Sequence, residues 1–99
     1  MITEQMILKF GKDILKRFEH NLNGGTMILF NVLTYDVWFG NSSTQDLFRL
    51  INGERTIESI HHHLVEQYKE DPEDAVIESF DNIILELLDK RFLEVCINE

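Results

Sequence analysis

The chain has one cysteine, one proline and no long apolar run, and each shortage excludes a class of protein. A lone Cys96 cannot form an internal disulfide, which favours a reducing compartment. One proline and five glycines leave no segment with the composition of a linker or a low-complexity tail. No run approaches the roughly 20 apolar residues that span a bilayer, and Met1–Gln5 lack the basic start of a signal peptide. We therefore expect a cytoplasmic protein.

Basic residues are also scarce, since 9 Lys and Arg stand against 18 Asp and Glu for a formal net charge of -9. Nucleic-acid binding depends on Lys and Arg that neutralise phosphates, and an anionic surface repels DNA and anionic membranes. We therefore expect neither nucleic acid nor membrane as a partner, and instead a partner with basic or apolar segments. A length of 99 residues suits a single domain, 1–99.

The N-terminal half has the composition of strands. Residues 27–30 and 37–39 are short apolar runs rich in strand-forming residues, and residues 33–36 fit a connection between them. A turn signal, Asn23-Gly24-Gly25, precedes the first run. An earlier strand at residues 14–18 would complete a three-stranded antiparallel sheet.

The residues before position 19 leave two interpretations open. A strand over residues 14–18 is one of them, and a helix is the other, because Ile7, Phe10, Ile14 and Phe18 also fit one face of a helix. We expect the strand. Residues 1–13 are then expected to form a flexible N-terminal segment, with Met1–Met6 disordered.

The C-terminal half predicts three helices. The first enters at residues 41–45, where a Ser hydroxyl can cap it, and ends at Asn52-Gly53. The second runs from a Thr56 cap to about Tyr68. The third is expected to have Asp71 as its cap and Pro72 as its first helical residue, and to reach about residue 90 or 91. A short extended tail at 92–95 follows. The fold class is therefore α+β, a three-stranded antiparallel sheet followed by three helices with a helix-turn-helix core.

Several joints of this pattern resemble the PqqD family. Residues 38–43 resemble the family's strand followed by Leu-Asn-x-Thr. Residues 47–53 resemble its helix that ends in Leu-Leu-Asp-Gly, and residues 56–60 resemble its Thr-Val-x-x-Ile helix start. Residues 68–73 and 87–93 resemble the entry and exit of that family's third helix. The likeness covers about Ile14 to Val95. Two residues depart from the family pattern: Gly40 stands where Leu is usual, and Ser43 stands where Thr is usual.

This resemblance implies a fold and a function. The family fold is a winged helix-turn-helix, and its members are recognition elements for ribosomally made, post-translationally modified peptides. Such a domain captures the leader region of a precursor peptide and presents it to a maturation enzyme, which can be a radical SAM maturase, a leader peptidase of lasso-peptide pathways or a cyclodehydratase. A chain of this length resembles the free-standing versions. The resemblance thus implies a binding module and not an enzyme, with no cofactor.

The resemblance also implies where the peptide binds. An extended peptide would pair with the free edge of the third strand, Asp36–Gly40, with the third helix as the other wall. Independently, the apolar residues of that helix span roughly 140°, whereas a stripe that only covers a core needs about 100°. A more deeply buried helix explains the same arc equally well. The residues expected to contact the peptide are Asp36, Val37, Trp38, Phe39, Ile77, Phe80, Asp81, Ile84 and Leu88.

Strand alternation adds a second expectation. Trp38 points to one face of its strand, and Val37 and Phe39 point to the other, so the two sets cannot share one core. Residues 27–32 are apolar at nearly every position, which indicates that both faces of the sheet are covered. A homodimer and docking of the enzyme are the two hypotheses for what covers the second face.

Three consecutive histidines, His61–His63, suggest a metal site at first sight. Neighbouring residues on a helix point about 100° apart, so these side chains would not converge on one ion. We expect two exposed histidines, one half-buried, and no metal. Cys96 has no His nearby in the sequence, so we expect no nucleophile and no other catalytic residue.

An acidic cluster over residues 66–74 fits a solvated face and a helix cap, and it could also dock a basic surface of a partner.

The alternative function is a winged-helix DNA-binding regulator with residues 57–68 as its recognition helix. Major-groove reading favours Arg, Lys, Asn and Gln, whereas this segment carries Glu58 and Glu66. The charge count therefore favours the peptide-binding interpretation.

Overall fold

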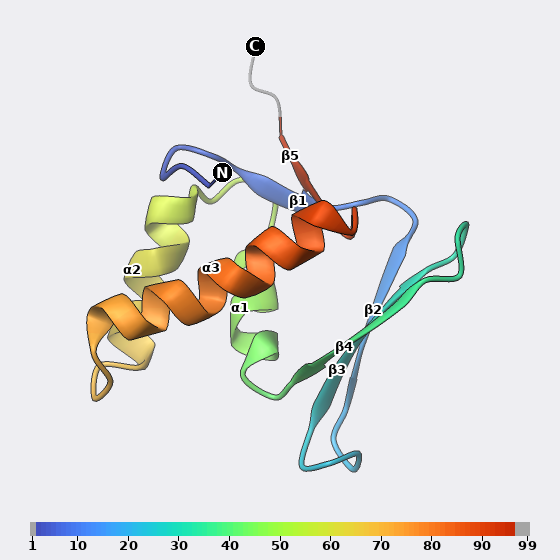
Figure 1. Cartoon of the computed structure of the whole chain (residues 1–99), viewed down its shortest axis with the longest axis horizontal. Coiled ribbons are helices and arrows are strands. Elements are labelled where there is room, and N and C mark those ends of the chain that lie inside the picture. Colours follow the sequence, from blue (N-terminus) through green and yellow to red (C-terminus); the bar gives the residue numbers. More distant parts are fainter. Residues whose placement is uncertain (1, 97–99) are drawn as a thin grey trace.

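The computed structural model describes residues 2–96 and arranges them as two small antiparallel sheets around three helices (Figure 1). None of the helices in that range is long and apolar enough to cross a membrane. The elements in chain order are β1 (Leu8–Phe10), β2 (Ile14–Glu19), β3 (Thr26–Asn31), β4 (Val37–Asn41), α1 (Thr44–Leu50), α2 (Ile57–Gln67), α3 (Glu73–Asp89) and β5 (Leu93–Val95).

The three-stranded sheet has the order β2-β3-β4, and both pairings are antiparallel, which confirms the sequence prediction. Residues 14–19 form a strand, so the helical alternative for this segment was wrong. The β3–β4 connection is stabilised by Asn31, whose Oδ1 accepts from the backbone N–H groups of Leu33 and Thr34. Tyr35 then takes a left-handed backbone with a φ of 66°.

One face of this sheet joins the core. Met27, Leu29 and Trp38 point inward and are buried, and they belong to one apolar cluster with Leu47 and Phe48 of α1. The indole of Trp38 lies 5.9 Å from the ring of Phe48, between centroids. The helices thus cover one face of the sheet, which extends beyond them in Figure 1.

Helix starts differ in how well the sequence predicted them. The Thr56 cap of α2 is confirmed, because its Oγ1 accepts from the N–H of Ser59 at 3.2 Å. Ser43 precedes α1 but makes no cap hydrogen bond, since its hydroxyl donates to Asn41 Oδ1. Asp71 is not the cap of α3: its N–H closes a turn onto Tyr68, and the helix begins at Glu73.

The turn between α1 and α2 forms at the predicted Asn-Gly pair, although α1 ends at Leu50, two residues earlier than expected. Asn52 Oδ1 accepts from the N–H groups of Glu54 and Arg55. These hydrogen bonds replace the ones that the two N–H groups would make if the helix continued. Gly53 has a φ of 80°, a left-handed conformation that suits glycine.

The N-terminal segment is part of the fold, which corrects the expectation that residues 1–13 are flexible; Met1 lies outside the described residues. Strand β1 pairs with β5, so that Leu8 lies opposite Val95 and Phe10 opposite Leu93. Leu8 is fully buried, and β1 crosses above α3 in Figure 1. Because the two strands come from opposite ends of the chain, local sequence patterns could not predict their pairing.

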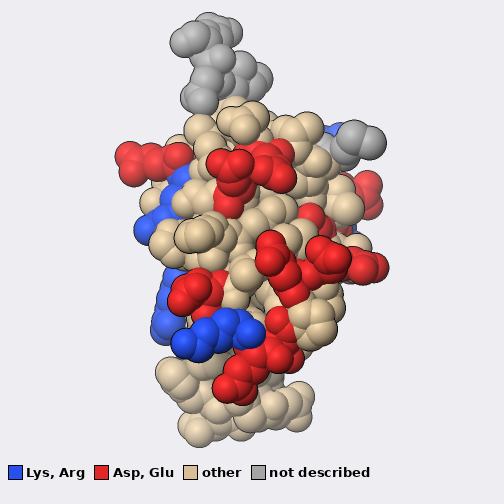
Figure 2. Space-filling view, turned by 90° about the vertical axis from the view of Figure 1, so that its left-hand side faces the viewer, with Lys and Arg blue, Asp and Glu red and all other residues tan. Residues whose placement is uncertain are grey.

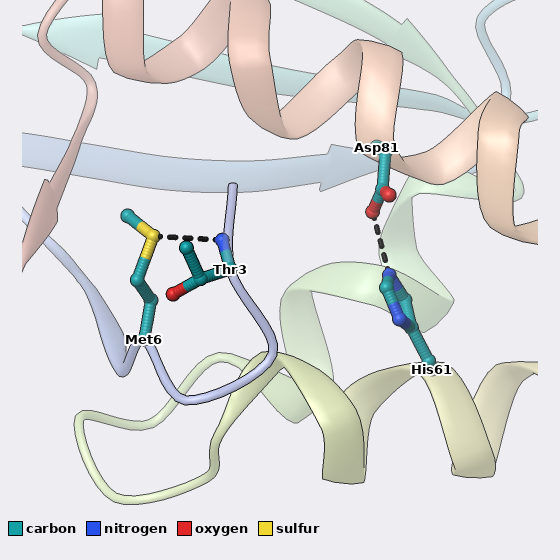
Figure 3. Close-up of polar contacts among 4 residues, drawn as sticks. All are labelled: Thr3, Met6, His61 and Asp81. Atoms are coloured by element: carbon teal, nitrogen blue, oxygen red, sulfur yellow. Dashed lines mark hydrogen bonds and ion pairs between the residues drawn. The ribbon is translucent and has the colours of Figure 1, made fainter. Parts of the chain in front are cut away.

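The same segment completes the start of α2. The N–H groups of Ile57 and Glu58, which have no partner within the helix, donate to the carbonyls of Met6 and Glu4 at 2.8 and 3.0 Å. A tight turn shapes the segment that supplies these carbonyls, and within it the Thr3 N–H donates to Met6 Sδ at 3.1 Å (Figure 3). The first residues therefore serve as backbone partners for a helix that lies about 50 positions later in the chain.

Candidate binding groove

Strand β4 is an edge of the three-stranded sheet. Within residues 2–96 it pairs only with β3. The Asp36 carbonyl accepts from the Asn31 N–H, so by the two-residue alternation of an antiparallel ladder the backbone groups of Trp38 and Gly40 also face β3. The N–H and C=O groups of Val37 and Phe39 therefore point away from the sheet. These four groups could bind another extended chain.

Two hollows follow this edge: α3 forms the far side of the first, and Lys90 and Phe92, which follow the end of α3, form the far side of the second. The first has a volume of about 270 Å³ and the second about 280 Å³. Asn41 and Gly40 lie near Asn82 in the first hollow, whereas Val37 lies near Lys90 in the second, so β4 and α3 run in opposite directions. We call the two hollows together the β4–α3 slot. Its lining consists of Asp36, Val37, Trp38, Gly40, Asn41, Thr44, Asn82, Ile83, Glu86, Lys90 and Phe92.

Trp38 lines the first hollow of the slot. Its side chain is 8% exposed, and its Nε1–H donates to the carboxylate of Glu86, which ties the strand to the helix. The chain's only tryptophan is therefore a buried core residue and also lines the slot. Since both ends of the hydrogen bond are fixed on regular elements, the slot has a defined width at this position.

Gly40 makes room for this tryptophan. A Cβ at position 40 would lie 2.5 Å from one carbon of the indole and 2.6 Å from Thr44 Oγ1, distances that real Cβ atoms do not show. The indole therefore fills the space that a side chain at position 40 would occupy.

Val37 and Phe39 lie on the opposite face of the sheet from Trp38, as strand alternation predicts. They are 47% and 62% exposed. Asp36, at the entry of the strand, lines the second hollow, and its carboxylate accepts from the Thr34 hydroxyl at 2.9 Å. The four predicted strand residues are thus together at one edge, two of them facing the slot through their side chains.

The residues predicted on α3 lie elsewhere. Ile84 and Phe80 are buried in the core, at 0% and 6% exposure, and Leu88 is half-buried against it. Asp81 is in polar contact with His61 of α2, and its Oδ1 lies 2.6 Å from Nε2 of that imidazole (Figure 3). Ile77 lines a separate hollow beside α2. This edge of α3 faces α2 and the core, so these five residues do not line the β4–α3 slot.

The slot uses the other edge of α3. Asn82, Ile83, Glu86 and Lys90 recur at three- and four-residue steps and form one stripe along the helix. The prediction followed the apolar arc and Asp81 just beyond its edge, whereas this stripe is mostly polar. The sequence feature that could have indicated these slot residues is a polar stripe beside the apolar arc of the helix, with Ile83 at the boundary between them.

Other polar groups lie away from the slot. Among residues 2–96, no group of three His, Cys, Asp or Glu side chains is placed to hold a metal ion. His61 is half-buried, and His62 and His63 are exposed, as the sequence predicted.

Tyr68, at the end of α2, donates a hydrogen bond from its hydroxyl to the carboxylate of Asp46 on α1. Burial, that hydrogen bond, and the negative charges of Asp46 and Asp71 raise the pKa of Tyr68 from 10.0 to about 12.

An acidic surface covers the end of the molecule at which α2 passes into α3 (Figure 2). Residues 66–78 contain six Asp and Glu residues, all exposed, and Lys69 is the only basic residue among them. This surface includes the first turn of α3, where negative side chains interact favourably with the helix dipole.

Comparison with known proteins gives no assignment. No family model matches the chain, and no significant match to a curated protein or to a solved structure was found.

Proposed function

We propose that the chain is a non-catalytic peptide-binding module. It binds the leader region of a ribosomal precursor peptide as an added strand on β4, and it delivers that peptide to a maturation enzyme, a leader peptidase or a radical SAM maturase. In this proposal the fold is a winged helix-turn-helix, with α1 and α2 as the helix pair and the β3–β4 hairpin as the wing. The resemblance of residues 14–95 to the PqqD pattern suggests the class of peptide and enzyme.

The observation that supports the proposal is an unprotected strand edge beside a ready slot. Proteins usually protect sheet edges with charged side chains, especially Lys. The two edges of this sheet differ in that respect, because β2 carries Lys16, Arg17 and Glu19, whereas β4 carries no charged residue. Helix α3 lies across the first hollow from β4, so a segment added to this edge would lie against the helix.

The slot defines the chemistry of a suitable peptide. Main-chain bonds to Val37 and Phe39 would hold any extended sequence, and every second side chain of the peptide would enter the slot. There it would meet the apolar side chain of Ile83 and the carboxylate of Glu86. A leader with an aliphatic residue followed at a nearby position by Lys or Arg fits this lining.

The DNA-binding alternative receives less support. It would place α2 in the major groove, where the exposed residues Glu58 and Glu66 would approach phosphates. Peptide binding involves no such approach to phosphates.

A synthetic leader peptide from the precursor encoded beside this chain's gene tests the proposal by calorimetry. We expect saturable binding to the native protein. Ile83→Asp should weaken it at least about tenfold, equal to about 1.4 kcal/mol, because it places a carboxylate in the slot next to Glu86. Leu85→Asp is the matched control, since Leu85 lies on the same helix, is 42% exposed and does not line the slot.

The backbone of the peptide provides a second readout. N-methylation at alternate positions of the leader removes the N–H groups that would bond to β4, so one of the two alternating sets should lose binding and the other should keep it. The absence of any saturable binding by the unmodified leader would refute the proposal. Equal losses for Ile83→Asp and Leu85→Asp would refute the assignment to the slot.

A further inference from the structure

The second face of the three-stranded sheet is apolar, and no helix or strand within residues 2–96 covers it. Of the nine large apolar side chains that are exposed within residues 2–96, seven lie between positions 15 and 39. Ile28 and Phe30, in the middle strand, are half-buried, although no helix covers their face. We call this surface the outer face, and its central residues are Leu15, Ile28, Phe30, Tyr35, Val37 and Phe39.

These side chains are neighbours across the strands. The register places Ile28 opposite Phe39 and Phe30 opposite both Leu15 and Val37. The ring of Tyr35 lies 6.2 Å from that of Phe30, between centroids, which extends the outer face onto the β3–β4 hairpin. A contiguous exposed apolar patch of this kind usually marks an interaction site.

The charge distribution favours a second copy of this chain as the partner that packs on the outer face. Residues 12–41 contain three basic and three acidic side chains, whereas residues 42–89 contain three basic and twelve acidic ones. The whole net charge of -9 therefore belongs to the helical part of the chain. Two copies that met through their helices would repel each other, but two copies that met through their sheets would join neutral surfaces and keep the acidic helices on opposite outer sides.

The rim of the outer face is self-complementary. Leu15, Arg17 and Glu19 alternate on one side of β2, and Arg17 Nε lies 2.8 Å from Glu19 Oε2, with side chains 75% and 37% exposed. A two-fold axis brings the same patch of both copies together, so residue i of one meets residue j of the other. Arg17 of each copy can then face Glu19 of the other beside the apolar centre.

We propose that the chain forms a homodimer in which the outer faces of two copies pack against each other. This arrangement leaves both β4 edges accessible, so it does not depend on the proposed peptide binding. Three strands about 4.8 Å apart and six residues of about 3.4 Å cover roughly 300 Å². That is well below the ~800 Å² per partner of a standard stable interface, so the dimer is weak and dissociates on dilution.

Sedimentation equilibrium over a range of concentrations, from about 1 μM to about 1 mM, tests the dimer. The native chain should move from a monomer mass of 11.7 kDa toward twice that value. Phe39→Asp should stay monomeric, because it would bury a carboxylate in the apolar centre. Leu85→Asp, an equally apolar-to-acid change at an exposed position on α3, should associate like the native chain.

A charge exchange tests the orientation. Arg17→Glu and Glu19→Arg should each weaken self-association, because like charges then face each other across the two-fold axis. A mixture of the two variants should recover dimers, since the acidic pair of one faces the basic pair of the other. A native chain that stays at 11.7 kDa throughout the range would overturn the dimer, and so would an equal effect of Phe39→Asp and Leu85→Asp. Mixed variants that fail to recover association would overturn this packing.

Discussion

Gly40 lies beneath the indole of Trp38, and this contact limits what either position can become. Gly40→Ala would place a Cβ within 2.6 Å of the ring and of Thr44 Oγ1, and such overpacking typically costs about 1–3 kcal/mol of folding stability. Gly11→Ala is the matched control, because its Cβ would lie 3.4 Å from Ile14 Cγ1, an ordinary contact. Urea unfolding of both variants measures the difference.

The cause can be isolated with a second substitution. If the cost of Gly40→Ala comes from the indole, the same change should cost clearly less in a Trp38→Ala background. Additive effects in this double-mutant cycle would contradict the close packing of the two residues.

Tyr68 makes stability depend on alkaline pH. The folded chain holds the phenol proton up to about pH 12, whereas an unfolded chain releases it near 10.0. The folded state therefore binds more protons between these values, and stability falls as the pH rises from 10 toward 12. We expect the stability difference between native chain and Tyr68→Phe to shrink over that window.

Titration of the tyrosinate absorbance checks the same group directly. The chain has two tyrosines, so a Tyr35→Phe variant reports Tyr68 alone. A midpoint near 10 in that variant would contradict the raised pKa.

At the scale of elements, the β1–β5 pair ties both ends of the chain to the helices. Leu8 of β1 and both Phe92 and Leu93 around β5 are buried. Leu8→Ala should lower the free energy of unfolding by about 2–5 kcal/mol, because it removes a fully buried side chain. Lys9→Ala, one residue later and exposed, should change it by less than about 0.5 kcal/mol.

Denaturant unfolding separates the two variants. Similar small effects of Leu8→Ala and Lys9→Ala would mean that β1 is not part of the cooperative core. A large effect of Leu8→Ala with an unchanged dependence on denaturant concentration would place β1 within it.

Local patterns predicted the elements well where neighbours in sequence form the structure. The β2–β3–β4 sheet is made of consecutive hairpins, and Thr56 caps α2 through a residue three positions away. The β1–β5 pair depends on contacts between residues 8–10 and 93–95, which no local pattern encodes. The start of α3 was missed by one residue, since Pro72 precedes the helix and Asp71 forms a turn with Tyr68.

Of the candidate site, the β4 side was predicted from the sequence, whereas the α3 side was not. Alternation along β4 separated Trp38 from Val37 and Phe39. On α3 the choice between two edges of one apolar arc depends on where α2 and β4 pack, and Asp81 turned out to face His61. A helix alone does not say which of its sides is covered by which neighbour.

At the scale of the whole molecule, the chain separates charge from apolar exposure. The acidic residues gather on the helices, visible where α2 meets α3 in Figure 2, and the exposed apolar residues gather on the sheet. Acidic charge and apolar exposure therefore lie on different parts of a fold that measures 41 × 35 × 19 Å. The β4 edge lies on the apolar side, so an added strand would widen the outer face by one row of side chains.

The hydrogen bond between Trp38 and Glu86 has a practical consequence. The chain contains one indole, and it stands where an incoming segment would displace water. If a peptide binds as proposed, the emission of this indole should therefore shift on binding to the unlabelled native chain, and it should shift in the same way in Leu85→Asp.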